Sequence, residues 1–246
     1  MLPFTYLNVQ KNERQEYNLK NMKKTHFLIV IVFAIFTLSS CLKDDAQPTP
    51  QALVTLLNAY PDDTGIYYRM DGNSISQSNG DFKGLTYFRA FPGNRKLEIL
   101  GRVDNKAIMD TTMAYADSTV YTGFVYGIAG KPKFIRTTDL PISDVAEKAA
   151  VRFIQLGNGI GKVTLKIGEQ EVPAFKDRVQ ENKNTVTETQ IFRPVSSGTF
   201  TISVLDEDGA VLVKRENIEL KNGYYYTFAL MGTKGDAQKP LYLGYF

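Results

Sequence analysis

The chain contains few side chains that could carry out covalent chemistry. Among its 246 residues there is one cysteine, Cys41, and one histidine, His26. A Ser-His-Asp or Cys-His catalytic centre needs one of these side chains, and so does a zinc site built from thiolate or imidazole ligands. If everything before Cys41 is removed as a leader, only carboxylate pairs, Ser-Lys pairs or oxygen-bound calcium remain. We therefore predict that the protein is not an enzyme and holds neither a metal nor a cofactor.

The segment before Cys41 has the pattern of a secretory leader. Residues 22–24 supply a positive start, residues 27–36 are an unbroken apolar run, and small residues follow directly before Cys41. This order is typical of a signal peptide, and the run is shorter than the roughly 20 residues of a membrane-spanning helix. We predict a signal peptide over residues 22–40. Residues 1–21 are polar and are interpreted as an extension that precedes the true start codon, or else as part of a long leader.

The tetrapeptide Leu38-Ser39-Ser40-Cys41 resembles the lipobox of bacterial lipoproteins. The resemblance implies that Cys41 is acylated, with palmitate for example, and becomes the mature N-terminus. Each buried methylene contributes about 0.8 kcal/mol to membrane binding, and stable anchoring takes two chains or two signals. We expect Cys41 to anchor the protein in the cell envelope, at the outer membrane. The acidic pair Asp44-Asp45 either resembles an export signal for the cell surface or is a solvated part of the tether.

The charge balance argues against a nucleic-acid partner. Five of the 29 basic residues and two of the 26 acidic ones precede Cys41, which leaves 24 of each in the remaining chain. A neutral chain has no basic excess to displace counterions from a phosphate backbone. The remaining chain of roughly 200 residues is long enough for one large or two small domains. It lacks Trp and is rich in Tyr and Phe, which favours strands.

The chain after residue 51 repeats itself with an offset of about 97 to 105 residues. Residues 54–59 parallel 151–156, and residues 121–127 parallel 226–232. Short strand patterns separated by turn residues recur in both copies. Strands are expected near residues 52–59, 64–70, 85–90, 95–101, 106–115, 119–126 and 133–138, and near residues 150–156, 162–167, 188–193, 199–205, 211–219, 223–231 and 241–246.

About seven strands per hundred residues is typical of an immunoglobulin-like sandwich. We therefore predict an all-β protein with two tandem immunoglobulin-like β-sandwich domains, over residues 52–138 and 150–246. A linker over residues 139–149 joins them, and residues 41–51 form the tether. The run 151–156 is apolar on both faces, which indicates a strand that lies under a second element.

The repeated part is similar to lipoproteins of Gram-negative cell envelopes that carry tandem immunoglobulin-like domains of unknown function. The strand Val151–Leu156, the strand and turn Lys162–Gly168, the pair Tyr226-Thr227 and, in the first copy, Met70-Asp71-Gly72 carry this resemblance. It covers residues 52–246. It implies a fold and an address, and it supplies no catalytic residues.

Aromatic residues are the candidate ligand-binding side chains. Tyr60, Tyr67 and Tyr68 could form a platform for sugars, although core packing is the alternative explanation. Phe82, in a loop, is expected to be the most exposed aromatic. Arg89 and Arg193 occupy matched positions in the two copies, which indicates stacking, a buried ion pair or a binding role.

Three functions compete on this evidence. The first is a binding module that presents loops to a glycan, a peptide or another protein. The second is a structural accessory subunit of an envelope or surface assembly. The third, a carboxylate-dependent glycan hydrolase, has the weakest support because no pair of carboxylates stands out.

Replacing the anchor residue tests the predicted address. We expect Cys41→Ala to lose the acyl label and to leave the membrane fraction, because the thiol that carries the lipid is gone. Cell fractionation and metabolic labelling with a palmitate analogue measure both effects. Ser40→Ala, which keeps the thiol and a small preceding residue, serves as the control. Unchanged labelling of Cys41→Ala would contradict the prediction.

Overall fold

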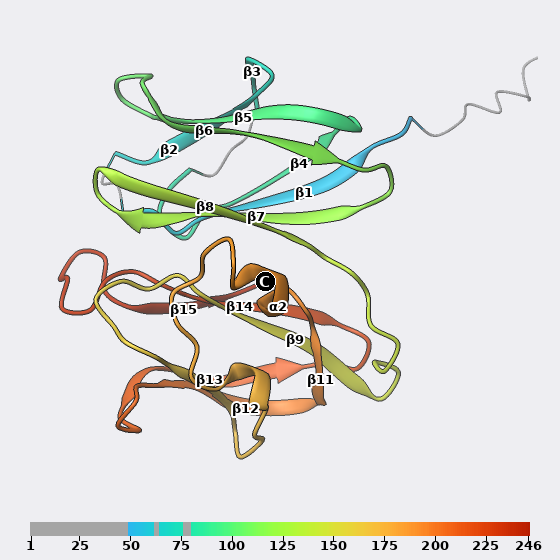
Figure 1. Ribbon diagram of the computed structural model, residues 1–246. Helices are drawn as coiled ribbons and strands as arrows, with labels where there is room; N and C mark the ends of the chain where they lie inside the picture. Colours follow the sequence, from blue (N-terminus) through green and yellow to red (C-terminus); the bar gives the residue numbers. More distant parts are fainter. Residues whose placement is uncertain (1–48, 62–63, 76–79) are drawn as a thin grey trace, which may run out of the picture. The chain divides into compact units, whose positions relative to one another are not determined.

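The computed structural model describes residues 49–61, 64–75 and 80–246, and their regular structure is almost entirely β-strand (Figure 1). Pro50–Phe246 forms one compact unit by itself. The predicted leader, Cys41 and the tether up to residue 48 lie outside the described residues.

Two four-stranded sheets form the first half of this unit. One has the order β4-β1-β7-β8 and the other the order β3-β2-β5-β6. The strands are β1 (Ala52–Asn58), β2 (Ile66–Met70), β3 (Asn73–Ser74), β4 (Leu85–Ala90), β5 (Gly93–Gly101), β6 (Ala107–Tyr115), β7 (Val120–Ile128) and β8 (Lys131–Thr138). We call this half the first sandwich.

Two further sheets form the second half, which we call the second sandwich. Their orders are β11-β9-β14-β15 and β10-β12-β13. The elements are β9 (Lys148–Gln155), β10 (Thr164–Ile167), the 3-10 turn η2 (Pro173–Phe175), the helical turn α2 (Val186–Thr189), β11 (Arg193–Ser196), β12 (Gly198–Leu205), β13 (Val211–Leu220), β14 (Tyr225–Met231) and β15 (Tyr242–Tyr245).

The two sandwiches repeat one topology. In the first, β1 pairs parallel with β7 and antiparallel with β4. In the second, β9 pairs parallel with β14 and antiparallel with β11. Each pair of sheets encloses its own apolar cluster, which includes Leu56 and Ile99 in the first sandwich and Phe153 and Ile202 in the second. The predicted all-β class and the duplication of the strand pattern are thus confirmed.

One expected strand is wrong. Residues 188–193 were predicted to be extended, whereas α2 occupies Val186–Thr189 and β11 begins only at Arg193. The cause is the buried carboxylate of Glu181, whose Oε2 accepts hydrogen bonds from the hydroxyls of Thr185 at 2.6 Å and Thr189 at 2.9 Å. Two hydroxyls four residues apart can reach one acceptor only if the segment between them turns as a helix.

The strand β9 is buried on both faces, as its sequence predicted. Val151 and Phe153 point into the core of the second sandwich. Ile154 and Leu156, on the other face of the strand or just beyond its end, belong to a separate apolar cluster that joins the two sandwiches. Because a strand alternates its side chains, the same segment contributes to two cores.

That second cluster, which we call the junction core, contains buried residues from both sandwiches. It joins the sheet of β1 and β7 to the sheet of β9 and β14. Its buried members are Leu57, Ala59, Phe124, Tyr126, Ile135, Ile154, Leu156, Ala229 and Met231. The two sandwiches therefore share apolar surface that neither could bury alone.

A buried arginine lies beside the junction core. The side chain of Arg152 on β9 is 1% exposed, and its Nη1 lies 2.6 Å from Oδ1 of Asp139, which follows β8. The guanidinium also donates to the hydroxyls of Thr122 and Thr137 in the first sandwich and of Thr227 in the second. Burial lowers the pKa of Arg152, and the charge of Asp139 opposes this shift. We call these five residues the Arg152 network.

Removing the carboxylate tests how much the network stabilises the unit. We expect Asp139→Ala to lower the free energy of unfolding by about 3 kcal/mol, because it leaves a buried cation without its counter-charge. Urea unfolding of a fragment with residues 50–246 measures the change. Asp144→Ala breaks the exposed ion pair with Lys148 and should cost less than about 1 kcal/mol. Equal losses in the two variants would contradict this role for Asp139.

Candidate functional site

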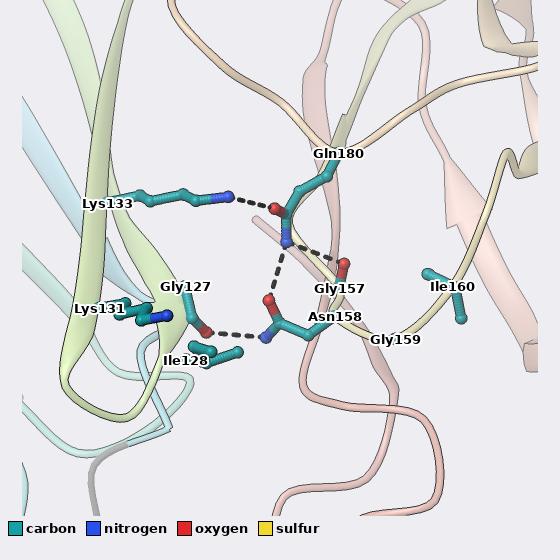
Figure 2. A pocket seen from close by; sticks show the side chains of 9 residues that line it. All are labelled: Gly127, Ile128, Lys131, Lys133, Gly157, Asn158, Gly159, Ile160 and Gln180. Atoms are coloured by element: carbon teal, nitrogen blue, oxygen red, sulfur yellow. Dashed lines mark hydrogen bonds between the residues drawn. The ribbon is translucent and has the colours of Figure 1, made fainter.

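A pocket of about 330 Å³ opens at the junction of the two sandwiches (Figure 2). The hairpin between β7 and β8 forms one wall, and the loop after β9 forms another. The lining residues are Gly127, Ile128, Lys131, Lys133, Gly157, Asn158, Gly159, Ile160 and Gln180. Neither sandwich contains the pocket alone.

Glycines shape the backbone of both walls. Gly127 has a φ of +113°, and a Cβ there would lie 2.4 Å from the carbonyl oxygen of Lys131. Only glycine tolerates this conformation at such close approach of the opposite strand. On the other wall Gly159 has a φ of +70°, within the turn Gly157-Asn158-Gly159. These positions place the carbonyl of Gly127 opposite the side chain of Asn158.

The polar groups of the pocket are joined by hydrogen bonds that cross the junction (Figure 2). Nδ2 of Asn158 donates to the carbonyl of Gly127 at 2.8 Å. Nε2 of Gln180 donates to Oδ1 of Asn158 at 2.9 Å and to the carbonyl of Gly157 at 3.0 Å. Nζ of Lys133 in turn donates to Oε1 of Gln180 at 2.7 Å. The two walls are thus linked through one asparagine and one glutamine.

The residues next to Gln180 are anchored more deeply. The carboxylate of Glu181 is buried and forms an ion pair with Arg178. The backbone carbonyl of Glu181 accepts a hydrogen bond of 2.6 Å from the hydroxyl of Tyr126, a residue of the junction core. Burial raises the pKa of Tyr126 to about 12, so this hydroxyl remains a donor at neutral pH. The segment that carries Gln180 is therefore attached to both sandwiches.

The charge of the pocket is positive. Lys131 is exposed and has no acidic partner within the described residues, while Lys133 contacts only a neutral amide oxygen and the ring face of Tyr126. The nine lining residues, all of them described, include no carboxylate. Two ammonium groups without a counter-charge suit an anionic group of a ligand. The lining offers backbone amides and amide side chains, which bind and orient rather than react.

The predicted aromatic platform is not formed. Tyr60 and Tyr68 are 3% and 0% exposed and belong to the core of the first sandwich. Tyr67 is half-buried, and its hydroxyl donates to Oδ1 of Asn105 at 2.6 Å. The reason is alternation: in β2 the ring of Tyr68 points between the sheets and that of Tyr67 points away. Buried rings cannot stack on a sugar, so core packing was the correct alternative.

Phe82 is also not the exposed aromatic that was expected. Its ring is partly buried against the junction core, with the ammonium of Lys83 5.5 Å from its centroid. Among the described residues, the most exposed rings are instead those of Tyr87, Phe91 and Tyr224, at 66%, 62% and 60%. Phe82 thus has a structural place at the junction that a loop position did not indicate.

The matched arginines do not form a shared buried ion pair. Arg89 is exposed, and Arg193 is half-buried with a buried Nε that lacks a hydrogen-bond partner. Buried ion pairs instead involve Arg152 and Arg178. Arg152 aligns with Thr55 in the first copy and so lies where the two copies differ. In the sequence, Arg152 is distinguished only by having a residue of another type, Thr55, at the matched position of the first copy.

The part of the chain that the structure describes contains no helix long and apolar enough to cross a membrane. The same part also contains no group of three His, Cys, Asp or Glu side chains that could bind a metal ion.

A family model described as a domain of unknown function, DUF4397, matches residues 52–166. This range spans the first sandwich, β9 and most of β10. No curated protein matches the chain.

Several solved structures share low similarity with the chain. A family 26 carbohydrate-binding module of Eubacterium rectale, in complex with maltoheptaose, has a TM-score of 0.25 at 10% identity, over 79% of this chain and 96% of that one. A family 41 carbohydrate-binding module from streptococcal virulence factors, which recognises α-glucan, has a TM-score of 0.25 at 9% identity, over 75% and 94%. A candidate adhesin of Bacteroides ovatus has a TM-score of 0.21 at 7% identity, over 83% and 94%.

Replacing the bridging asparagine tests the geometry of the pocket. We expect Asn158→Ala to lower the free energy of unfolding by about 1–3 kcal/mol, because it leaves the carbonyl of Gly127 and one donor of Gln180 without this partner. Urea unfolding measures the loss. Asn222→Ala, at an exposed turn, should change stability by less than about 0.5 kcal/mol. A neutral Asn158→Ala would show that the two walls do not depend on this side chain.

Proposed function

We propose that the protein is a non-catalytic binding module of the cell envelope, and that its ligand enters the junction pocket with an anionic group. The observation that carries this proposal is the uncompensated positive charge of Lys131 and Lys133 in a pocket that both sandwiches build. The immunoglobulin-like character of each sandwich and the lipid anchor at Cys41 are part of the same proposal.

The order of the pocket supports a binding role. Asn158 and Gln180 already use their polar atoms in hydrogen bonds across the junction, so the walls are fixed before a ligand arrives. Preorganised walls reduce the ordering that a ligand must impose when it binds. Lys131 remains available, and its ammonium is the group we assign to the first contact with the ligand.

The expected ligand class follows from the lining. The amide oxygens of Asn158 and Gln180 each accept one hydrogen bond within the pocket and keep a second lone pair for a saccharide hydroxyl. The lysines match a carboxylate or phosphate substituent of the saccharide. We therefore propose an acidic saccharide as the ligand. An anchor at Cys41 would present the pocket to envelope glycans of this kind.

Titration calorimetry on the fragment with residues 50–246 tests the ligand class. We expect short oligouronates to bind and neutral glucan oligosaccharides of equal length to give no heat. Inorganic phosphate, as a third arm, shows whether the charge alone suffices. The affinity should fall when the salt concentration is raised about tenfold, from about 0.05 to about 0.5 M, because salt screens the attraction between exposed charges.

Charge reversal identifies the site. We expect Lys131→Glu to weaken oligouronate binding by at least about tenfold, because it replaces an attraction with a repulsion. Lys183→Glu changes an exposed lysine outside the pocket and should leave the affinity within about twofold. Equal affinity of the Lys131→Glu variant and the wild type, or heat from neutral glucans alone, would contradict the proposal.

A further inference from the structure

The free edge of β6 differs from every other sheet edge in the described part of the chain. β6 has nine residues and one charged side chain, Asp110. The other edge strands are β3, β4, β8, β10, β11, β13 and β15. Most are shorter than β6, and β8 carries Pro132 with three basic residues. Charged side chains, prolines and short strands keep sheet edges from pairing with other chains. β6 is long, has no proline and carries a single charge.

The duplication provides an internal comparison. β13 is the strand of the second sandwich that matches β6, because each is the edge next to the long inner strand β5 or β12. Leu97 and Ile202 are the buried residues that align the copies, and they pair with Thr111 and Arg215. Asp110 and Thr112 therefore match Lys214 and Glu216, which form a surface ion pair.

The centre of the β13 edge is protected, whereas the centre of the β6 edge is not. β13 carries four charged side chains, and Asn217, with a φ of +58°, lies where its register with β12 shifts. A bulge and charges together disfavour pairing with another strand. β6 has one register shift near its start, at Ile108, and runs without another from Met109 to Tyr115. The centre of the matched edge strand is thus closed in the second sandwich and open in the first.

A hydrogen bond of Ala114 shows which backbone groups of β6 point away from β5. The carbonyl of Ala114 accepts a hydrogen bond of 2.7 Å from Arg136 on β8, so it points away from β5. In an antiparallel strand, alternate residues direct both peptide groups to the same side. The N–H and C=O groups of Asp110 and Thr112 therefore also point outward, and the described residues provide no partner for them.

We propose that β6 pairs antiparallel with β6 of a second copy of this chain, about a two-fold axis at Thr111. This register pairs the regular stretch Met109–Met113 of the two strands, which leaves out the register shift at Ile108 and the carbonyl of Ala114 that Arg136 already contacts. It places Asp110 opposite Thr112 of the second copy, so both outward-facing residues form backbone hydrogen bonds. It also places Met109 opposite Met113 of the second copy, which extends the apolar face over the core of the first sandwich.

The charges of the strand agree with a second copy as the occupant. Asp110 is already paired with Lys96 on β5 at 2.8 Å, and the two-fold register puts no like charges directly opposite each other. Like charges opposite each other would oppose pairing. The edge of β6 contains none of the residues that line the pocket. A test of this pairing therefore does not depend on the ligand proposed for the pocket.

Analytical ultracentrifugation of the fragment with residues 50–246, over a range of concentrations, tests the pairing. We expect a reversible dimer. Hydrogen exchange at the amides of Asp110 and Thr112 should slow as concentration rises, while exchange at Lys214 and Glu216 on the matched edge stays the same.

Two substitutions at one position test the register. Thr112→Asp faces Asp110 of the second copy and should raise the dissociation constant at least about fivefold. Thr112→Lys faces the same carboxylate and should leave it unchanged or lower it. Glu216→Lys on the matched edge is the control and should have no effect. A fragment that stays monomeric at millimolar concentration, or a dimer that Thr112→Asp leaves unchanged, would overturn the proposal.

Discussion

The burial of one guanidinium between two sandwiches is the constraint on which the rest of the structure depends. Arg152 is a residue of the second sandwich, yet most of its partners belong to the first or to the segment directly after it. A buried cation is tolerated only when counter-charge and acceptors surround it. Its hydrogen bonds can be satisfied only in one arrangement of the two halves.

The apolar and polar parts of the junction have different consequences. The junction core stabilises contact between the sandwiches, but apolar packing alone permits small shifts of one surface on the other. The Arg152 network and the Asn158–Gly127 hydrogen bond are directional and define the register. The pocket requires that register, because its lysines come from the first sandwich and its amide side chains from the second. A duplicated fold thereby gains a site that a single copy lacks.

The sequence predicted the regular part of the structure well, and the predicted site poorly. Strand patterns and turns repeated in the two copies located nearly all strands, and the apolar run of β9 indicated burial on both faces. The helical turn α2 escaped prediction because its cause is a buried carboxylate, Glu181, that lies outside the turn itself. The aromatic residues were proposed as ligand contacts, but Tyr60 and Tyr68 are core residues because of strand alternation.

The residues of the pocket and the network share a property that explains why they were missed. The guanidinium of Arg152 is paired with Asp139 after β8 and with threonine hydroxyls on three strands. These partners come close to Arg152 only in the folded chain. Lys133 and Gln180 lie 47 residues apart in the sequence and form a hydrogen bond across the junction. The useful signal was the departure from the repeat, as at Thr55 and Arg152 or at Asp110 and Lys214. Each of these positions carries an interaction that is found in one copy and absent from the other.

The most direct test of the fixed junction is the measurement of residual dipolar couplings for backbone amides of residues 50–246 in a weakly aligned solution. If the Arg152 network and the junction core fix the two sandwiches, one alignment tensor fits the couplings of both. Two tensors of different magnitude would show that the sandwiches move independently, and the account of a shared pocket would be wrong.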